Sequence, residues 1–499
     1  MFKPSPGVVP GKPHLAAPVS TSSVEPAGTL KRLVRAFARA GIALERDGAV
    51  WRVRAQAQPD APAAEILLPA ELPLELKAVQ QLVQLATAHH PDGGAVCRAC
   101  ATPDFHPGDS GVAIGSVVES DALLIPQAVG TDINRGMRLH ALELTLDEFL
   151  DRKAALLAHL KGDFLLGTRD VVHSAATVRG FLEGGLPAWV EGLAAGAQGS
   201  LARADVSQLR AELERHYQHG VFGAGCADWM PDLPEAGWVR EDGLGTVGRG
   251  NHFVELQVVE EVLDARRAWA WGIRRGQVVA MIHSGSRSLG GYIGKRWLDK
   301  AREAWPVTAK YPESKVFPLS WATNPALCRD YLEAEATAAH YGAVNRAILG
   351  ELLRLRLRQV FGDRGAPLVY DLPHNLTLKE GDRWVARKGA CPAHPEQPVI
   401  IPGSMGAASF LLVGLGSERF LRSASHGAGR AVARIDMGRV QGEAALGLGG
   451  VECITLRDER RIEEAPAAYK PIGPVIDAQV AAGLVAVVAR FRPLVTFKA

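Results

Sequence analysis

The sequence predicts an α/β fold, more fully an α+β arrangement, in which central sheets are surrounded by helices. Hydrophobic residues make up 47% of the 499 positions and charged residues 22%, which is ordinary for a chain that buries a large core. Segments with the apolar spacing of helices alternate with short apolar runs typical of buried strands. The polar clusters are spread over the whole chain, without an internal repeat or an obvious linker. We therefore expect one large compact domain over residues 29–499, preceded by a flexible Pro/Gly/Ser-rich tail over residues 1–28.

The individual elements follow from local periodicity. An amphipathic helix is expected over residues 30–40, a strand with alternating apolar residues over 49–55, and a second amphipathic helix over 74–88. Short apolar runs between Gly, Pro and Asp predict buried strands over 112–118 and 122–125. Further helices are expected over 146–160, 206–216 and 331–361, with glycine-rich loops between and after the first two. The arginines of residues 352–358 could line an RNA path, but a solvated helix end is the favoured interpretation.

Composition excludes several classes of protein. The 56 Lys and Arg residues exceed the 54 Asp and Glu residues by only two, so any nucleic-acid contact has to be a local site rather than a broadly basic surface. Six cysteines in a chain of this length do not indicate a disulfide scaffold. No apolar segment follows Met1 as in a secretory signal, and no apolar run reaches the roughly 20 residues that span a bilayer. We expect a cytoplasmic protein with no membrane association.

Four short segments each carry a metal-competent residue beside glycine or another small residue. These residues are Asp132, His252, His283 and His374. One carboxylate and three imidazoles would suit a divalent transition metal such as Mn²⁺ or Zn²⁺. Three of the four lie where a predicted strand gives way to a loop, which is where α/β folds usually build sites. Taken singly, each histidine is more often a hydrogen-bonded core or surface residue than a metal ligand.

Other segments are suited to holding a nucleotide. Residues 401–409 offer backbone donors and two hydroxyls, and Arg387 and Lys388 offer cations for phosphates. Residues 422–430 place His426 among small residues and arginines, where an imidazole could meet an anion and act as a nucleophile. The alternative for each segment is an ordinary turn.

Together these segments resemble the RtcB family of GTP-dependent RNA ligases. The resemblance covers about residues 97–498 and depends most on Pro103-Asp-Phe-His-Pro-Gly108, Gly250-Asn-His-Phe-Val-Glu255, His283-Ser-Gly-Ser-Arg287, Pro402-Gly-Ser-Met-Gly406 and Ser425-His-Gly-Ala-Gly-Arg430. It implies a single compact RtcB-like domain. It also implies an enzyme that joins RNA 3′-phosphate or 2′,3′-cyclic phosphate ends to 5′-hydroxyl ends in RNA repair or tRNA splicing, with GTP as co-substrate and one or two Mn²⁺ ions.

The resemblance implies roles for individual residues. His426 would be the histidine that becomes guanylylated, Asp104 would orient it, and Tyr469 would close the guanine pocket. The implied manganese ligands are Asp132, His252, His283 and His374. The implied GTP contacts are Asn251, His252, Phe253, Val254, Glu255, His374, Asn375, Pro402, Gly403, Ser404, Met405, Ser409, His426, Gly427, Ala428, Gly429, Tyr469 and Lys498.

One position departs from the family pattern. Family members carry a cysteine that bridges two manganese ions where this chain has Arg135. A guanidinium has no free acceptor and stays protonated, so it cannot bind a metal and would repel a nearby cation.

Three interpretations of this departure are open. In the first, Arg135 acts catalytically by clamping a phosphate, as arginines do at other phosphoryl-transfer sites, and a single Mn²⁺ is held by Asp132, His252 and either His283 or His374. In the second, ligation is lost and only binding remains. In the third, another cysteine takes the position, either Cys100, which forms a Cys-x-x-Cys pair with Cys97, or Cys391. The first is favoured because His426 and the nucleotide-contacting positions are all present.

The favoured function is therefore a GTP- and Mn²⁺-dependent RNA ligase that acts through a guanylyl-histidine. The alternative is an RtcB-like protein that binds guanine nucleotide or RNA ends without joining them. A metal-dependent phosphohydrolase is a third class, but such an enzyme would have no need of His426. The expected partners are GTP and RNA with the ends named above, and an activating protein could take part.

Overall fold

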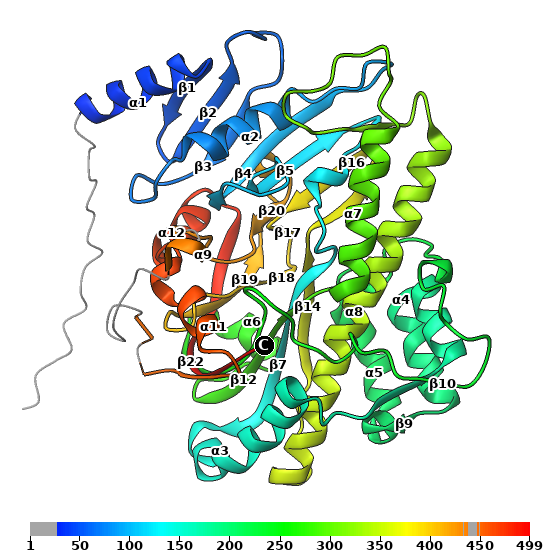
Figure 1. Cartoon of the computed structure of the whole chain (residues 1–499). Coiled ribbons are helices and arrows are strands. Elements are labelled where there is room, and N and C mark those ends of the chain that lie inside the picture. The colour runs from blue at the N-terminus through cyan, green and yellow to red at the C-terminus, as the bar shows by residue number, and fades with distance from the viewer. Residues whose placement is uncertain (1–26, 433, 438–446, 449) are drawn as a thin grey trace, which may run out of the picture.

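Two large sheets organise the chain, one above the other in Figure 1. The computed structural model describes residues 27–432, 434–437, 447–448 and 450–499. Residues 1–26 of the predicted tail lie outside the described residues, and helix α1 (Ala27–Arg39) is the first element. The fold class is confirmed: helices and mainly antiparallel sheets form one compact domain.

The first sheet belongs mainly to the N-terminal part of the chain. Its seven strands are, in spatial order, β1 (Ile42–Asp47), β2 (Val50–Ala55), β3 (Ala64–Leu67), β4 (Val96–His106), β5 (Ile114–Ser120), β16 (Arg383–Lys388) and β15 (Leu376–Glu380). Neighbouring pairs are antiparallel except β3 and β4.

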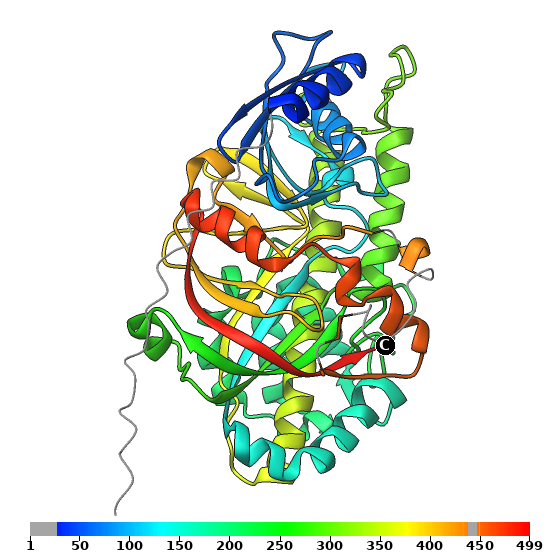
Figure 2. The same ribbon diagram turned by 90° about the vertical axis from the view of Figure 1, so that its left-hand side faces the viewer.

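The second sheet has eight strands and carries most of the predicted site. Its spatial order is β14 (Leu368–His374), β7 (Arg135–Thr145), β12 (Gln277–Ser284), β11 (Phe253–Val262), β22 (Val485–Lys498), β19 (Ser409–Gly414) and β18 (Pro398–Ile401), with β21 (Glu452–Thr455) parallel to β22. Figure 2 shows β22 curving across this sheet.

Short strands and helices complete the domain. The short strands are β10 (Trp238–Val239), β8 (Val171–Ser174) and β9 (Gln198–Gly199), the pair β13 (Leu319–Ser320) and β6 (Leu123–Leu124), and the pair β17 (Ala390–Pro392) and β20 (Ser423–Ser425). The other α-helices are α2 (Leu76–Ala86), α3 (Leu146–Lys161), α4 (Ala175–Ala195), α5 (Val206–Glu212), α6 (Ala265–Ala270), α7 (Arg287–Glu303), α8 (Pro325–Phe361), α9 (Arg434–Met437), α11 (Asp458–Glu463) and α12 (Ile472–Ala481). None of the helices described is both long and apolar enough to cross a membrane.

Side chains of the eight-stranded sheet divide between two cores because they alternate along each strand. On β12, Val278, Ala280 and Ile282 pack with residues of α3, α4 and α8, whereas Val279 and Met281 pack in a second cluster. Both faces of the sheet are therefore buried, and the loops at its strand ends carry the polar side chains.

Helix α8 passes through the domain and supports this sheet. It has 37 residues, a length of about 55 Å, and it lies beside α4 and α7 in Figure 1. It begins earlier than predicted because Asn324 caps it, accepting from the Leu327 N–H, and Pro325 fits the first turn. The interpretation of its last arginines as a solvated end is wrong for Arg354, which is 4% exposed, because the helix is buried as far as Leu357.

Several predicted elements are confirmed, with two corrections. The expected helices over 30–40, 74–88 and 146–160 are α1, α2 and α3, and the expected strand over 49–55 is β2. The helix expected over 206–216 ends at Glu212 and continues as a 3-10 turn. The second correction concerns α4, which lies between two predicted helices where the sequence predicts glycine-rich loops. Its helical signal is weakened by Pro187 and by Gly185, whose φ of +73° marks a kink.

Candidate active site

The four predicted metal-binding residues lie where the ends of four strands of the eight-stranded sheet meet, and we call this end of the strands the edge. Strands β7 and β11 begin there, and β12 and β14, which run antiparallel to β7, end there. His283 at the end of β12 lies opposite Phe253 of β11 and Met137 of β7, and His374 at the end of β14 lies opposite Arg135. Antiparallel pairing therefore brings segments far apart in the sequence to one place.

Asp132 and Arg135 form an ion pair at this edge. The Oδ2 atom of Asp132 lies 3.1 Å from Arg135 Nε and 3.1 Å from His252 Nε2. The other end of the guanidinium donates through Nη2 to Asn251 Oδ1. Burial would raise the pKa of Asp132, but His252 and Arg135 outweigh it and hold that pKa below its ordinary value. The carboxylate is therefore ionised and already has a cation, the Arg135 guanidinium, beside it.

The other imidazoles face one another. His283 Nε2 lies 3.2 Å from His374 Nε2, and the His283 ring meets the His252 ring with 5.1 Å between centroids. His283 Nδ1 lies 3.1 Å from the carbonyl oxygen of Asn251, so Nδ1 carries the proton and Nε2 keeps its lone pair. Burial lowers the pKa of all three histidines, and Arg135 lowers that of His283 further. Neutral imidazole is the form that binds metals.

The spacing of His283 and His374 fits a shared metal ion. Two nitrogens that each lie about 2.1 Å from one ion are about 3.0 to 3.4 Å apart when the angle between them is right or tetrahedral. The observed 3.2 Å falls within this range. Within the described residues, no three His, Cys, Asp or Glu side chains already converge as a complete ligand set.

His426 directly follows β20 and lies beside this histidine cluster. Its Nδ1 atom lies 2.7 Å from Asp104 Oδ2 and 2.7 Å from the carbonyl oxygen of Gly389. Both partners are acceptors, so Nδ1 carries the proton and Nε2 has the free lone pair. The ring lies against that of His374, with 4.7 Å between centroids. This arrangement leaves Nε2 of His426 with the free lone pair that a nucleophile needs.

Asp104 is buried and accepts three hydrogen bonds. Thr102 Oγ1 donates to Oδ1 at 2.6 Å, and the backbone N–H and Nδ1–H of His426 donate to Oδ2 at 3.3 Å and 2.7 Å. Burial raises the pKa of Asp104, but the bonds from His426 and Thr102 outweigh it, and the net shift is downward. Lys470 donates to the carbonyl groups on either side of Asp104. His426 thus has an ionised acceptor held in place.

These groups open onto a cavity of about 600 Å³, a volume suited to a nucleotide. His426, Arg135 and His283 contribute to its wall. The remaining predicted residues along it are Asn251, Phe253, Glu255, Pro402, Gly403, Ser404, Met405, Gly427, Ala428, Gly429, Tyr469 and Lys498. The structure therefore brings most of the predicted GTP contacts to one cavity with His426.

Comparison with known proteins agrees with this arrangement. A model of the family described as tRNA-splicing ligase RtcB matches residues 81–499. The chain belongs to the RtcB family. It is 34% identical over 455 residues to the RNA-splicing ligase RtcB of Mycobacterium tuberculosis, covering 83% of this chain and 99% of that protein. It is 32% identical over 433 residues to the tRNA-splicing ligase RtcB of Pyrobaculum aerophilum, covering 79% and 86%.

Five predicted GTP contacts of this RtcB family member do not line the cavity: His252, Val254, His374, Asn375 and Ser409. The Val254 side chain packs into the opposite core because neighbouring residues of a strand point to opposite faces. Ser409 accepts from the backbone N–H of Gly403 and so supports the loop that does line the cavity. Asn375 links the site internally: its amide donates to the Asp132 carbonyl, and its oxygen accepts from the Gly389 N–H.

The prediction that Arg387 and Lys388 face phosphates is wrong for this RtcB cavity, because neither residue lines it. Arg387 is 1% exposed and pairs with Glu380, with 2.6 Å between Nη2 and Oε1. Lys388 donates to Ser110 and to the Gln127 carbonyl, and burial lowers its pKa to about 8. Both cations form their contacts inside the protein, because both faces of β16 are buried at these two positions.

The interpretation in which another cysteine takes the bridging position is also wrong. None of Cys97, Cys100 and Cys391 lines the cavity. Burial raises the pKa of Cys100 and of Cys391 to about 12, so both are neutral thiols rather than metal-binding thiolates. The described lining of the cavity therefore offers no thiolate beside Arg135.

Glu255 of β11 is one of the acidic groups that line the RtcB cavity. It accepts from Gln257 and Thr496, and burial raises its pKa to about 7 against the lowering effect of those hydrogen bonds and of Lys498. Each carboxylate oxygen retains a second lone pair for a ligand. A pair of acceptors in a partly apolar cavity suits a ring that offers two adjacent N–H donors.

Sequence reasoning missed several cavity residues. Glu75 and Lys77 come from the start of α2, outside every motif. Arg430 and Glu464 form an ion pair, and Glu464 also accepts from the Tyr469 hydroxyl. Arg430 ends a motif that the sequence did single out, whereas nothing local marks Glu75, Lys77 or Glu464.

Proposed function

We propose that this chain is a GTP- and Mn²⁺-dependent RNA ligase that joins RNA 3′-phosphate or 2′,3′-cyclic phosphate ends to 5′-hydroxyl ends. Membership of the RtcB family and the printed names of its relatives support RNA joining. The single observation that carries the mechanism is the pair of acceptors on His426 Nδ1, which leaves Nε2 as a nucleophile on the cavity wall.

The proposed reaction has three transfers. His426 Nε2 attacks the α-phosphorus of GTP, a phosphoramidate forms and pyrophosphate leaves. The RNA 3′-phosphate oxygen then attacks the same phosphorus and releases the histidine. Finally the 5′-hydroxyl attacks the activated 3′-phosphate and releases GMP. A 2′,3′-cyclic phosphate is first opened by water. Asp104 stabilises the positive charge that develops on the imidazole in the first step.

Base recognition would lie at Glu255. The carboxylate offers two acceptors, which match the ring N–H and exocyclic amine of guanine but not the edge of adenine. Phe253 and Tyr469 lie on the same cavity and provide ring faces for the base. The loop of Pro402, Gly403 and Ser404 offers backbone groups nearer the phosphates.

We infer one resident metal ion rather than two. His283 and His374 have the spacing of two ligands of one ion, and a Mn²⁺ bound there would offset the charge of the triphosphate. At the other end of the cluster, Asp132 Oδ2 lies 3.1 Å from both His252 Nε2 and Arg135 Nε, and the guanidinium supplies a fixed positive charge. Its planar fork also suits a phosphate, so Arg135 would serve in place of the second ion.

A joining assay distinguishes the candidate functions. The purified chain is incubated with GTP, Mn²⁺ and an RNA pair with a 3′-phosphate and a 5′-hydroxyl, beside the His426→Ala variant. The proposal expects a joined product with the native chain only. Binding of GTP without product would favour the nucleotide-binding alternative, and release of inorganic phosphate without joining would favour the phosphohydrolase.

A further inference from the structure

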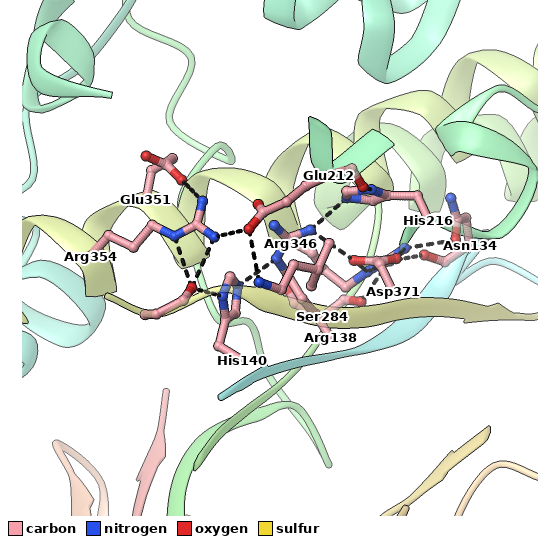
Figure 3. A network of polar contacts seen from close by, with 12 residues as sticks. Asn134, Arg138, His140, Glu212, His216, Ser284, Arg346, Glu351, Arg354 and Asp371 are labelled. Atoms are coloured by element: carbon pink, nitrogen blue, oxygen red, sulfur yellow. Dashed lines mark hydrogen bonds and ion pairs between the residues drawn. The ribbon is translucent and has the colours of Figure 1, made fainter. Parts of the chain in front are cut away.

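A buried network of charges includes Arg346 of helix α8 (Figure 3). We propose that Arg346 is a positioning residue for the active site. Its guanidinium ties together the three segments that carry Arg135, His283 and His374. The effect on catalysis rests on the proposed function, whereas the structural effect does not.

The contacts of Arg346 run in three directions. Nη1 donates to the carbonyl oxygens of Asn134, at 2.8 Å, and Ser284, at 3.2 Å. Nη2 donates to Asn134 Oδ1 at 3.2 Å and to Asp371 Oδ1 at 2.7 Å. Nε lies 3.1 Å from both carboxylate oxygens of Asp371. The side chain is fully buried, so these bonds have no competition from water.

Each partner is adjacent to a residue of the site. Asn134 precedes Arg135 and has a φ of +48°, so it sits in a tight turn. Ser284 follows His283 at the end of β12, and Asp371 lies on β14, three residues before His374. One planar group therefore sets how the start of β7 and the ends of β12 and β14 lie relative to one another.

The fit around the guanidinium is specific to arginine. A side chain on Gly136 would place its first carbon 2.5 Å from Arg346 Cζ, so the strand start is shaped around this group. A lysine at position 346 would keep the charge but concentrate its donors on one atom, and it could not reach all three partners at once.

Helix α8 also provides a matched control. Arg354 lies two turns further on, is 4% exposed, and pairs with Glu212 and Glu351 at 2.5 Å and 2.6 Å. It also donates to the carbonyl of Ala366. None of these partners lies in residues 132–138, 283–287 or 371–375, so Arg354→Lys disturbs an equally buried charge without a direct contact to the three segments.

The test compares Arg346→Lys with Arg354→Lys by hydrogen–deuterium exchange and by single-turnover guanylylation. For Arg346→Lys we expect faster exchange in residues 132–138, 283–287 and 371–375, and about a 100-fold lower maximal rate of guanylyl transfer with a KM for GTP within about threefold of native. For Arg354→Lys we expect native exchange in those segments and a rate within about threefold of native.

Equal effects of the two variants, or native exchange and rate in Arg346→Lys, would overturn the proposal. If Arg346→Lys does not fold, Asp371→Asn decides, because it weakens the contacts of Asp371 with Arg346 and, at 3.4 Å, with Arg138 of β7, and leaves the bonds of Arg346 to Asn134 and Ser284. It should speed exchange in residues 371–375 but not in 283–287, and the absence of that difference would overturn the proposal. If the native chain forms no guanylyl adduct, the proposed function fails, while the exchange measurements still decide the role of Arg346.

Discussion

The substitution Asp104→Asn tests how the nucleophile is prepared. Asparagine has the size of aspartate and keeps one oxygen for the Nδ1–H and backbone N–H of His426, which both bond to the same carboxylate oxygen. Its amide would then meet Thr102 Oγ1, which can rotate to accept because its hydroxyl also lies 3.2 Å from the Gly115 carbonyl. The variant should therefore fold with the native arrangement but without the negative charge.

The size of the effect follows from the second acceptor on Nδ1. The Gly389 carbonyl lies 2.7 Å away and is unaffected, so His426 keeps its tautomer. What is lost is the difference between a charged and a neutral hydrogen bond, about 1 to 2 kcal/mol in the transition state. That difference corresponds to roughly a 5- to 30-fold slower guanylyl transfer. If Asp104 alone fixed the tautomer, the loss would approach about 10⁴-fold, as in a serine protease triad.

Single-turnover guanylylation with saturating GTP and Mn²⁺, followed by intact mass, measures this step alone. Asp163→Asn is the matched control, because Asp163 is also fully buried and charged but pairs with Arg356, away from the cavity. Asp163→Asn should lower the free energy of unfolding and leave the rate of guanylyl transfer unchanged. A rate for Asp104→Asn within twofold of native would refute the role given to the carboxylate, and a 10⁴-fold loss would refute the role given to Gly389.

Two further predictions concern the metal and the core. Arg135→Cys should raise bound Mn²⁺ from one to two ions per chain by elemental analysis, since it restores a thiolate, and two ions on the native chain would contradict this. Glu335 is buried and its pKa is raised to about 7 from 4.5, so its proton is held more tightly in the folded state. Stability should therefore fall as pH rises from 4.5 to 7, by about 3 kcal/mol in all. Glu335→Gln, which cannot ionise, should remove this contribution to the slope in urea unfolding between pH 5 and 8 and leave that of Glu255, whose pKa is also raised to about 7; an unchanged slope would count against it.

The fold class and the residue types of the candidate site can be predicted from the sequence alone. Strands such as β2 and amphipathic helices such as α2 repeat a local pattern. Asp132, His252, His283 and His374 each lie in a segment with glycine or another small residue, and three of the four lie where a predicted strand gives way to a loop. These signals are local, so they survive in a single sequence.

Other features depended on contacts that no local pattern records. The Gly389 carbonyl that holds His426 is a backbone group and has no side-chain signature. Arg346 lies in no motif, and the sequence predicts Arg387 as a cation for phosphates, yet both are buried in ion pairs, Arg346 with Asp371 of β14 and Arg387 with Glu380 of the adjoining strand β15. Val254 was taken as a nucleotide contact from its motif, but the register of β11 turns its side chain into the core.

The most direct measurement is to locate the adduct. The chain is incubated with GTP and Mn²⁺, digested at neutral or alkaline pH, and its peptides are mapped by tandem mass spectrometry. We predict one guanylyl group per chain, on His426 through nitrogen, lost in acid and absent from His426→Ala. A chain that binds GTP in the cavity yet carries no guanylyl group, or carries it on another residue, would contradict the account.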